Sequence, residues 1–326
     1  MRWAIMAASM AMAVPAFGDD TDEIKPLSVE QATELVKAAE RMLVLDGPMM
    51  ISPEVAEILT RYEGTLVLNG PTTLTPEVAE ILAKHDKGML VLDCVESMPP
   101  ELAESLAKHR GELWLNQLTT LSEEAAEGLA KQTGSLQLNG LMTLSVGVAE
   151  ALAKHDGTVG LHCLTTLSTA DAEALAKVRG LLGLTGLMTL SPEAAEALAK
   201  HEDTLFVGCS VMLSRRVAEA LAKHRGTLGV FNLDTISEEA ATALAKHRGD
   251  LMLKGIRALS TEVAVALSKH EGSLDLLGLT TLTDEAAASI SQHRGEVNLR
   301  RLEALSAEAV EMLRSNPDIR LPEKFR

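Results

Sequence analysis

The chain is poor in positive charge. It has 30 Lys and Arg against 46 Asp and Glu, which gives a net charge of −16. A nucleic acid partner is therefore not expected, because affinity for phosphates depends on clustered cations. An anionic membrane surface would repel the protein for the same reason. This charge favours solubility and cationic partners, and it carries no information about the fold.

Long apolar runs are missing from all but the first residues. The N-terminal stretch MRWAIMAASMAMAVPAFGDD has a positive charge at Arg2, an Ala- and Met-rich apolar run, and small residues at Ala16 and Gly18. This pattern predicts a signal peptide over residues 1–18, followed by a short lead over 19–27. No other segment approaches 20 apolar residues, so membrane insertion is not expected. We expect an exported protein that is periplasmic, extracellular or attached to the cell surface.

Recognisable catalytic motifs are also missing. The sequence contains no Gly-rich phosphate loop, no H-E-x-x-H, no G-x-S-x-G and no clustered set of Cys and His. It therefore predicts no enzyme, no cofactor and no metal site. An enzyme assembled by folding from distant residues is the third and least favoured hypothesis.

The chain has only three cysteines. Cys94, Cys163 and Cys209 are separated by 69 and 46 residues, both multiples of 23. They occupy one position of a repeat in which other copies have glycine, and even two repeats apart they would lie about 10 Å from each other. A disulfide needs Cα atoms within about 7 Å, so we expect free thiols. Only Cys163 has a neighbouring histidine, His162, and adjacent strand residues face opposite ways, which argues against a catalytic thiol.

The chain does contain a regular internal repeat. Copies of the word LAKH end every 23 residues, with 24 in two places, and self-similarity of this kind is typical of a solenoid. The last residue of the word falls at His85, His109, Gln132, His155, Val178, His201, His224, His247, His270 and His293, with degenerate copies ending at Ala38, Tyr62 and Asn316. We predict one solenoid of about 12–13 units over residues 28–326. A capping helix over 28–40 begins it, and an edge strand with a tail over 317–326 ends it.

Each repeat changes its hydrophobic period partway. Residues 135–141 alternate and predict a short strand, whereas residues 192–201 predict a helix capped by Ser191. Glu196 and Lys200 are spaced for an ion pair within that helix, as are the equivalent residues of other copies. The glycine two residues after the column histidine suits a left-handed helix stop. The glycines at this position include Gly111, Gly157, Gly226, Gly249, Gly272 and Gly295.

Stacking strand–turn–helix units gives an α/β solenoid. Parallel strands lie about 4.8 Å apart, while packed helices need roughly 8 Å. The mismatch bends the stack into an open horseshoe with the parallel sheet on the concave side and the short helices on the convex side.

The segments LQLNGLMTLS and LWLNQLTTLS resemble the leucine-rich repeat family. The Ala-rich unit LTTLSxEAAEALAKHxG is, more narrowly, similar to repeats of exported, uncharacterised bacterial proteins. The resemblance covers residues 28–321 and implies a scaffold that recognises a partner, usually a protein. One departure concerns the turn, since Leu118 and Leu141 stand where that family has a ladder-forming asparagine, and Asn116 and Asn139 lie two residues earlier.

Eight of the nine histidines stand in one column of the repeat. We interpret them as caps of helix C-termini, where histidine can meet the last carbonyls and the negative end of the dipole. A metal ladder is disfavoured, because neighbouring helices lie too far apart for shared ligands at about 2 Å from zinc. A third hypothesis is a pH sensor, in which joint protonation below pH 6.5 changes assembly.

The most variable column is the residue between the two strand leucines, which faces the concave side. It reads Val44, Val67, Val91, Trp114, Gln137, Gly160, Gly183, Phe206, Gly229, Met252, Asp275, Asn298 and Arg320. Exposed aromatic residues are typical anchors of interfaces, and three of the few aromatic residues fall on this side. We predict a central trough with three glycines as a low floor. The candidate binding surface comprises Trp114, Gln137, Gly160, His162, Gly183, Phe206, Phe231, Met252 and Lys254.

The leading hypothesis is a non-catalytic binding scaffold, expected to be a monomer, that recognises a protein or an extended glycan through this surface. The alternative is a structural spacer or matrix protein, for which the variation along the concave column is drift. Substitutions on the concave side distinguish the two, because only a binding scaffold should be sensitive to them.

Overall fold

The computed structural model describes residues 25–46, 49–70, 74–209 and 213–326 of the 326-residue chain. The predicted signal peptide lies outside the described residues. No helix of the described part is long and apolar enough to cross a membrane.

Short parallel strands recur once per repeat. They follow one another in chain order in a 13-stranded sheet, and a separate pair joins β1 (Lys25–Pro26) to β3 (Met49–Met50). The 13 strands are β2 (Met42–Leu45), β4 (Thr65–Leu68), β5 (Leu90–Val91), β6 (Glu112–Trp114), β7 (Ser135–Gln137), β8 (Thr158–Gly160), β9 (Leu182–Leu184), β10 (Leu205–Gly208), β11 (Leu228–Phe231), β12 (Leu251–Met252), β13 (Leu274–Asp275), β14 (Val297–Asn298) and β15 (Ile319–Arg320). Leu205 pairs with Leu228 and Leu228 with Leu251, so the register repeats the 23-residue period of the sequence.

One helix follows each strand of the repeat. The helices are α1 (Val29–Ala38), α2 (Pro53–Leu59), α3 (Pro76–Leu82), α4 (Pro100–Leu106), α5 (Glu123–Leu129), α6 (Val146–Leu152), α7 (Thr169–Leu175), α8 (Pro192–Leu198), α9 (Arg215–Leu221), α10 (Glu238–Leu244), α11 (Thr261–Leu267), α12 (Asp284–Ile290) and α13 (Ala307–Arg314). Ser191 caps α8 as predicted, with its hydroxyl accepting the Ala194 N–H at 3.1 Å. The helix ends at Leu198, three residues before the predicted end at His201.

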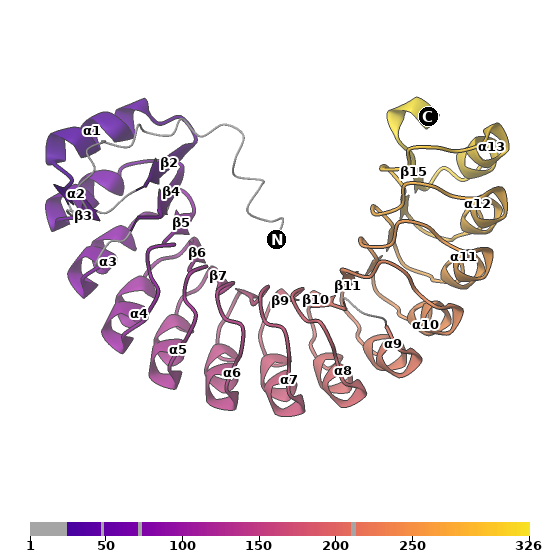
Figure 1. Ribbon diagram of the computed structural model, residues 1–326, viewed down its shortest axis with the longest axis horizontal. Coiled ribbons are helices and arrows are strands. Elements are labelled where there is room, and N and C mark those ends of the chain that lie inside the picture. Colours follow the sequence, from indigo (N-terminus) through magenta and orange to yellow (C-terminus); the bar gives the residue numbers. More distant parts are fainter. Residues whose placement is uncertain (1–24, 47–48, 71–73, 210–212) are drawn as a thin grey trace. The chain divides into compact units, whose positions relative to one another are not determined.

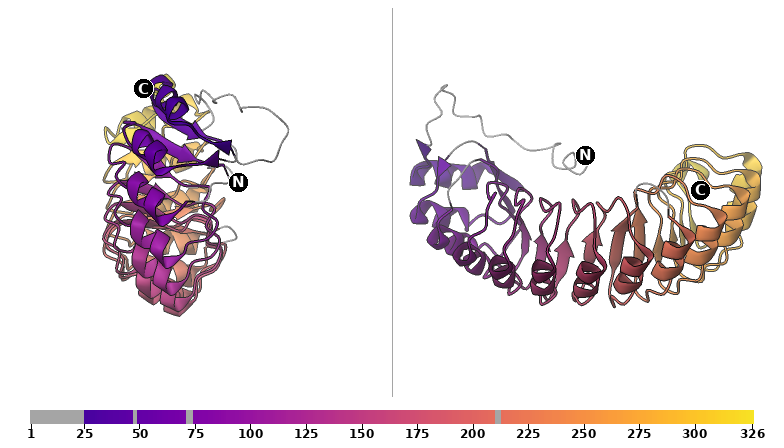
Figure 2. Two further views of the ribbon diagram at one scale, coloured as in Figure 1. Left: turned by 90° about the vertical axis from the view of Figure 1, so that its left-hand side faces the viewer. Right: turned by 60° about the horizontal axis from the view of Figure 1, so that its bottom comes forward.

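The chain divides into two compact units. Unit 1 comprises residues 1–141 and 154–160, and unit 2 comprises residues 142–153 and 161–326. Within each unit the strands line the inner side of an arc and the helices its outer side (Figures 1 and 2). We call the strand side the inner face. The predicted strand–turn–helix solenoid with an open parallel sheet is confirmed.

Leucines and alanines between sheet and helices form the core. In unit 2, Leu205 and Leu228 from the strands and Leu198 and Leu221 from the helices are all fully buried. Burying one such leucine contributes about 2 kcal/mol, and the same leucine positions recur in repeat after repeat. The leucine columns therefore hold the solenoid together and leave the inner face free to vary.

Two lysines of the predicted pairs within single helices bind a glutamate of another helix. Lys108 binds Glu80 at 2.7 Å and Lys154 binds Glu127 at 2.6 Å, so each lysine reaches the preceding helix. The helices end three residues before the histidine, which leaves each lysine outside helical geometry. The i, i+4 spacing consequently no longer brings lysine and glutamate together.

The predicted role of the glycine column is wrong at Gly226 and Gly249. There α9 and α10 end on the right-handed caps Ala222 and Ala245, and neither glycine has positive φ, whereas Gly295 of the same column has φ 143°. A Cβ at Gly249 would instead overlap the carbonyl oxygen of Gly226 and lie 2.9 Å from His247 Nε2. These glycines are present because neighbouring repeats approach each other closely here.

The turn after each strand closes without the asparagine of leucine-rich repeats. Leu118 and Leu141 are buried, and their N–H groups donate to Leu115 and Leu138 oxygens at 3.2 Å. Asn139 extends along the stack, with Nδ2 donating to Asn116 Oδ1 at 2.9 Å. The asparagine ladder of this chain therefore lies at the ends of the strands, two residues before its place in that family.

Candidate functional site: the inner face of unit 2

Four neighbouring strands of unit 2 alternate glycine with a large apolar residue. Register pairs Gly183 with Phe206, Phe206 with Gly229, and Gly229 with Met252. Phe206 and Met252 are half-buried, whereas both glycines are buried. The glycines give neighbouring side chains room to lie flat on the sheet.

Phe206 and Phe231 form an aromatic pair. Phe231 lies two residues beyond Gly229 on β11, and the ring centroids are 5.1 Å apart at an interplanar angle of 62°. Edge-to-face pairs of this kind contribute about 1 kcal/mol beyond their burial. A Cβ on Gly229 would lie 2.6 Å from each ring, so the pair exists only because this residue is glycine.

Charged and polar groups continue the surface from the aromatic pair. Lys254 Nζ lies 5.9 Å from the Phe231 ring centroid and 3.5 Å from Asp275 Oδ2. Asp275 Oδ1 in turn accepts the Asn298 side-chain amide at 3.0 Å and the Leu277 N–H at 3.1 Å. Lys254 thereby joins an apolar patch to a polar row that runs along β13 and β14.

The predicted glycine floor is wrong. The ring of His162 lies over Gly183, where a Cβ would be 2.5 Å from the imidazole, and its Nδ1 is 2.9 Å from the Thr185 hydroxyl. Burial lowers the pKa of His162, so its imidazole is neutral at pH 7. Side chains therefore cover the glycines, and the surface has no open trough at these positions.

A strained backbone position fixes the end of β11. Asn232 has φ 58°, and it is the one non-glycine residue with positive φ among those the structure describes. Its amide donates to the Thr185 oxygen, two repeats back, at 2.8 Å. Because Asn232 directly follows Phe231, this bond fixes the backbone that carries the second ring.

Three predicted site residues belong to unit 1. Trp114 is half-buried and its Nε1 donates to Glu112 Oε2 at 3.3 Å. Gln137 covers Gly160, which is buried beneath it. The six predicted residues of unit 2 do form one surface, in which His162, Gly183, Phe206, Phe231, Met252 and Lys254 belong to adjacent repeats. Asn232 was missing from the prediction, whereas Gly229 and Asp275 were named in the variable column but not in the candidate binding surface.

The histidine column is buried. His109 Nδ1 lies 3.4 Å from the oxygen of Ala83, the C-cap of α3, which agrees with the predicted capping role, but His201 and His293 contact other carbonyls. His201 Nε2 lies 2.9 Å from the Gly180 oxygen, and His293 Nε2 lies 2.9 Å from the Gly272 oxygen. Each carbonyl belongs to the preceding repeat, just before its strand. The histidines therefore connect neighbouring repeats, and the helix dipole argument for a charged imidazole fails, since burial lowers the pKa of His224, His247 and His270.

The cysteines form no disulfide. Burial raises the pKa of the Cys94 thiol to about 11, which keeps it protonated and unreactive at pH 7. No cluster of three or more His, Cys, Asp or Glu that could hold a metal occurs in the described residues.

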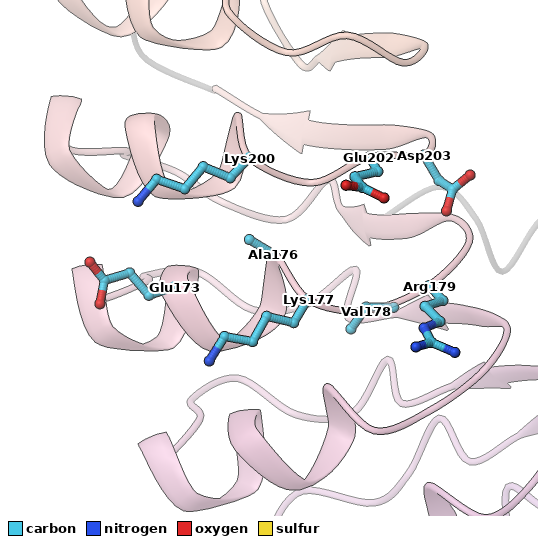
Figure 3. A pocket seen from close by; sticks show the side chains of 8 residues that line it. All are labelled: Glu173, Ala176, Lys177, Val178, Arg179, Lys200, Glu202 and Asp203. Atoms are coloured by element: carbon cyan, nitrogen blue, oxygen red, sulfur yellow. The ribbon is translucent and has the colours of Figure 1, made fainter.

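A cavity of about 570 Å³ lies between α7 and α8, beside Val178 (Figure 3). Val178 occupies a place in the histidine column. The lining has three cations and three carboxylates, with little apolar surface, so it offers a ligand no net charge to recognise. Its residues are Glu173, Ala176, Lys177, Val178, Arg179, Lys200, Glu202 and Asp203.

No family model matches the sequence, and no curated protein matches it. Solved structures are similar to it at the level of the repeat solenoid. An internalin of Listeria monocytogenes is 18% identical with a TM-score of 0.44, over 91% of this chain and 89% of that one. A leucine-rich repeat protein of Leptospira interrogans is 17% identical with a TM-score of 0.30, over 91% and 99%. A chain of the Toll–Spatzle complex of Drosophila is 13% identical with a TM-score of 0.42, over 84% of this chain and 46% of that one. The fold assignment therefore depends on this chain's own strand order and register.

Proposed function

We propose that the protein is an exported, non-catalytic scaffold that binds an extended segment of another protein on the inner face of unit 2. The observation that carries the proposal is the contact between Phe206 and Phe231. The sequence has only four phenylalanines, and two of them meet on the sheet surface while leucines fill the core.

The chemistry of the surface supports a protein ligand. Two phenyl rings and the Met252 side chain offer apolar area, and neutral His162 adds no charge to it. Lys254 and Asp275 stand at one end and can pair with polar or charged groups of a partner. Aromatic anchors beside a polar rim are the usual composition of protein interfaces. The edge-to-face rings do not form the flat platform on which a sugar ring would stack.

The test is capture of partners from cell-envelope extract and culture medium by three purified proteins. These are the native chain, Phe206→Asp and the control Thr242→Asp, which adds the same charge at an exposed position of α10 on the outer face. We expect a protein that the native chain and the control retain and that Phe206→Asp loses at least about tenfold, as for an interface anchor. Binding would then be measured with that protein in purified form.

Equal capture by all three proteins would remove the inner face as the binding site. Capture of nothing by any of them would favour a structural spacer. Circular dichroism at pH 7.5 must first show that Phe206→Asp is folded. Phe231→Ser, which removes the other ring without adding a charge, is the second variant.

A further inference from the structure

The histidine column of unit 2 is a continuous stack of buried imidazoles. His201, His224, His247, His270 and His293 are each at most 3% exposed. Successive ring centroids are 5.9 to 6.1 Å apart, with interplanar angles between 0° and 22°. Five ionisable rings are therefore held face to face in the interior, away from water.

The rings have few of the hydrogen bonds that would stabilise a cation, and backbone carbonyls near His224, His247 and His270 raise the pKa by less than burial lowers it. Nδ1 has no partner in any of the five, and in His224, His247 and His270 Nε2 has none either. An imidazolium has two N–H donors, and a buried donor without an acceptor costs about 1–3 kcal/mol. Two cations at 6 Å would also repel each other. Both effects make protonation of His224, His247 and His270 unfavourable in the folded column.

The charged groups around the column do not offset this. An exposed lysine directly precedes each of the first four histidines of the column: Lys200, Lys223, Lys246 and Lys269. An exposed charged residue directly follows each of the five: Glu202, Arg225, Arg248, Glu271 and Arg294. From the segments before the strands, Asp203 and Asp250 accept backbone N–H groups of Gly180 and Ser273. The electrostatic contributions that lower the pKa of His224, His247 and His270 come from neighbouring histidines.

The carbonyl groups beside the column lead directly into the sheet. Gly180 and Gly272, which face His201 and His293, stand two residues before β9 and β13. Gly226 and Gly249 occupy the same place before β11 and β12, and the rings of His224 and His247 lie against them. A ring that leaves the column thus removes support from the strands that carry Phe206, Phe231 and Met252.

We propose that this stack makes unit 2 an acid-triggered element, in which protonation of the column opens β10 to β13 cooperatively while neutral imidazoles keep them closed. The inference is independent of the proposed function, because it concerns only the closing and opening of the strands.

The sign of the pH effect follows from linkage. Unfolded histidine has a pKa of about 6.5, and burial with neighbouring imidazoles lowers the pKa of His247 to about 4. Between these values the open state binds more protons than the closed state, so stability falls as pH falls from 6.5 to 4. Above pH 6.5 the contribution of the neutral column is fully present.

The chain itself offers a non-titrating replacement. In unit 1, Gln132 stands in the histidine column, and its Nε2 donates to the Gly111 oxygen at 2.7 Å. The test protein is therefore the full chain with His224→Gln, His247→Gln and His270→Gln. The carboxylate control is Asp203→Asn with Asp250→Asn, which leaves the column intact.

The measurement is amide hydrogen exchange of peptides from β10 to β13, corrected for the intrinsic rate, between pH 7.5 and 4. For the native chain and the carboxylate control we expect opening to increase about 100-fold between pH 7 and pH 5. For the glutamine variant we expect less than about a threefold increase. Equal opening of native and glutamine proteins at every pH would overturn the proposal. If the triple variant is not folded at pH 7.5, His247→Gln alone is compared, with a smaller expected difference of the same sign.

Discussion

The two units build the same core and differ in what they place at the ends of their strands. In unit 1 this strand-end column is polar, and Asp46, Asn69, Asp93, Asn116 and Asn139 follow one another. Asn69 donates to Asp46 and Asn139 donates to Asn116, both at 2.9 Å. In unit 2 the same column reads His162, Thr185, Gly208, Phe231, Lys254, Leu277 and Arg300. Unit 1 thus joins repeats through asparagines of this column, whereas unit 2 does so through His162 and Thr185 and displays different side chains further along.

The histidine columns differ as well. Unit 1 has His85, His109, Gln132 and His155, and the carboxylates Asp86 and Asp156 counteract the lowering of the histidine pKa values. Unit 2 has five stacked rings whose neighbours are other rings. Positions of the repeat that face solvent can therefore vary while the fold is kept. A buried column also tolerates replacement where the new side chain keeps the bond between repeats.

The largest expected effect compares two glycines of this column, one in each unit. In Gly249→Ala of unit 2 the new Cβ would overlap the Gly226 carbonyl oxygen, whereas in Gly111→Ala of unit 1 it would lie 3.1 Å from the Gly88 oxygen. We expect Gly249→Ala to cost about 3 kcal/mol and Gly111→Ala about 1 kcal/mol. Gly134 of unit 1 has the same close approach as Gly249, so Gly134→Ala is the matched control and should also cost about 3 kcal/mol. Urea unfolding followed by hydrogen exchange in each unit measures all three. Equal costs for Gly111→Ala and Gly249→Ala would show that the distance to the neighbouring carbonyl oxygen does not determine the cost.

This glycine column also shows how far the sequence predicts the fold. The 23-residue period, the strand leucines and the Ser191 cap are local signals, and the structure contains all three. The role of Gly249, the partner of Lys108 and the bond of His155 each depend on a residue 21 to 28 positions away in the chain. Helical spacing indicated a local partner for each, and packing between repeats determined a different one.

The candidate site was predictable to a similar degree. Strand alternation placed Phe206 and Met252 on the inner face, because that signal has a period of two. It could not reveal that His162 lies over Gly183 or that Asn232 turns back to Thr185, since both depend on rotamers and on a single positive φ. The glycines were consequently taken for an open floor.

The second effect concerns the aromatic pair. Gly229→Ala places a Cβ 2.6 Å from both Phe206 and Phe231, whereas Gly160→Ala in unit 1 displaces only Gln137. We expect Gly229→Ala to separate the rings and to cost about 1.5 kcal/mol, and Gly160→Ala to cost about 0.5 kcal/mol. Ring-to-ring NOEs and thermal unfolding report the two outcomes. Retention of the NOEs in Gly229→Ala would mean that the rings do not need the glycine.

The third effect tests the asparagine ladder of unit 1. Asn139→Ala removes the bond to Asn116 and leaves a partly buried acceptor, which we expect to cost about 1 kcal/mol. Lys254→Ala, at the equivalent position of unit 2, removes a partly exposed ion pair and should cost at most about 0.5 kcal/mol. The difference in unfolding free energy is the readout. A larger loss for Lys254→Ala would show that Lys254 joins neighbouring repeats more strongly than Asn139 does.

The smallest effect separates the electrostatics of the two histidine columns. His224→Gln removes a neighbouring ring that lowers the pKa of His247, so that pKa should rise from about 4. Asp86→Asn in unit 1 removes a carboxylate that raises the pKa of His85 and His109, so both values should fall. NMR titration of the imidazole Cε1 protons measures the two changes in one experiment. If the pKa values of both columns shift in the same direction, solvent exposure controls both columns. If they shift in opposite directions, neighbouring rings oppose protonation in unit 2 and carboxylates favour it in unit 1. In the second case stability should fall with acid first in unit 2, because neighbouring imidazoles oppose the charge that its column gains.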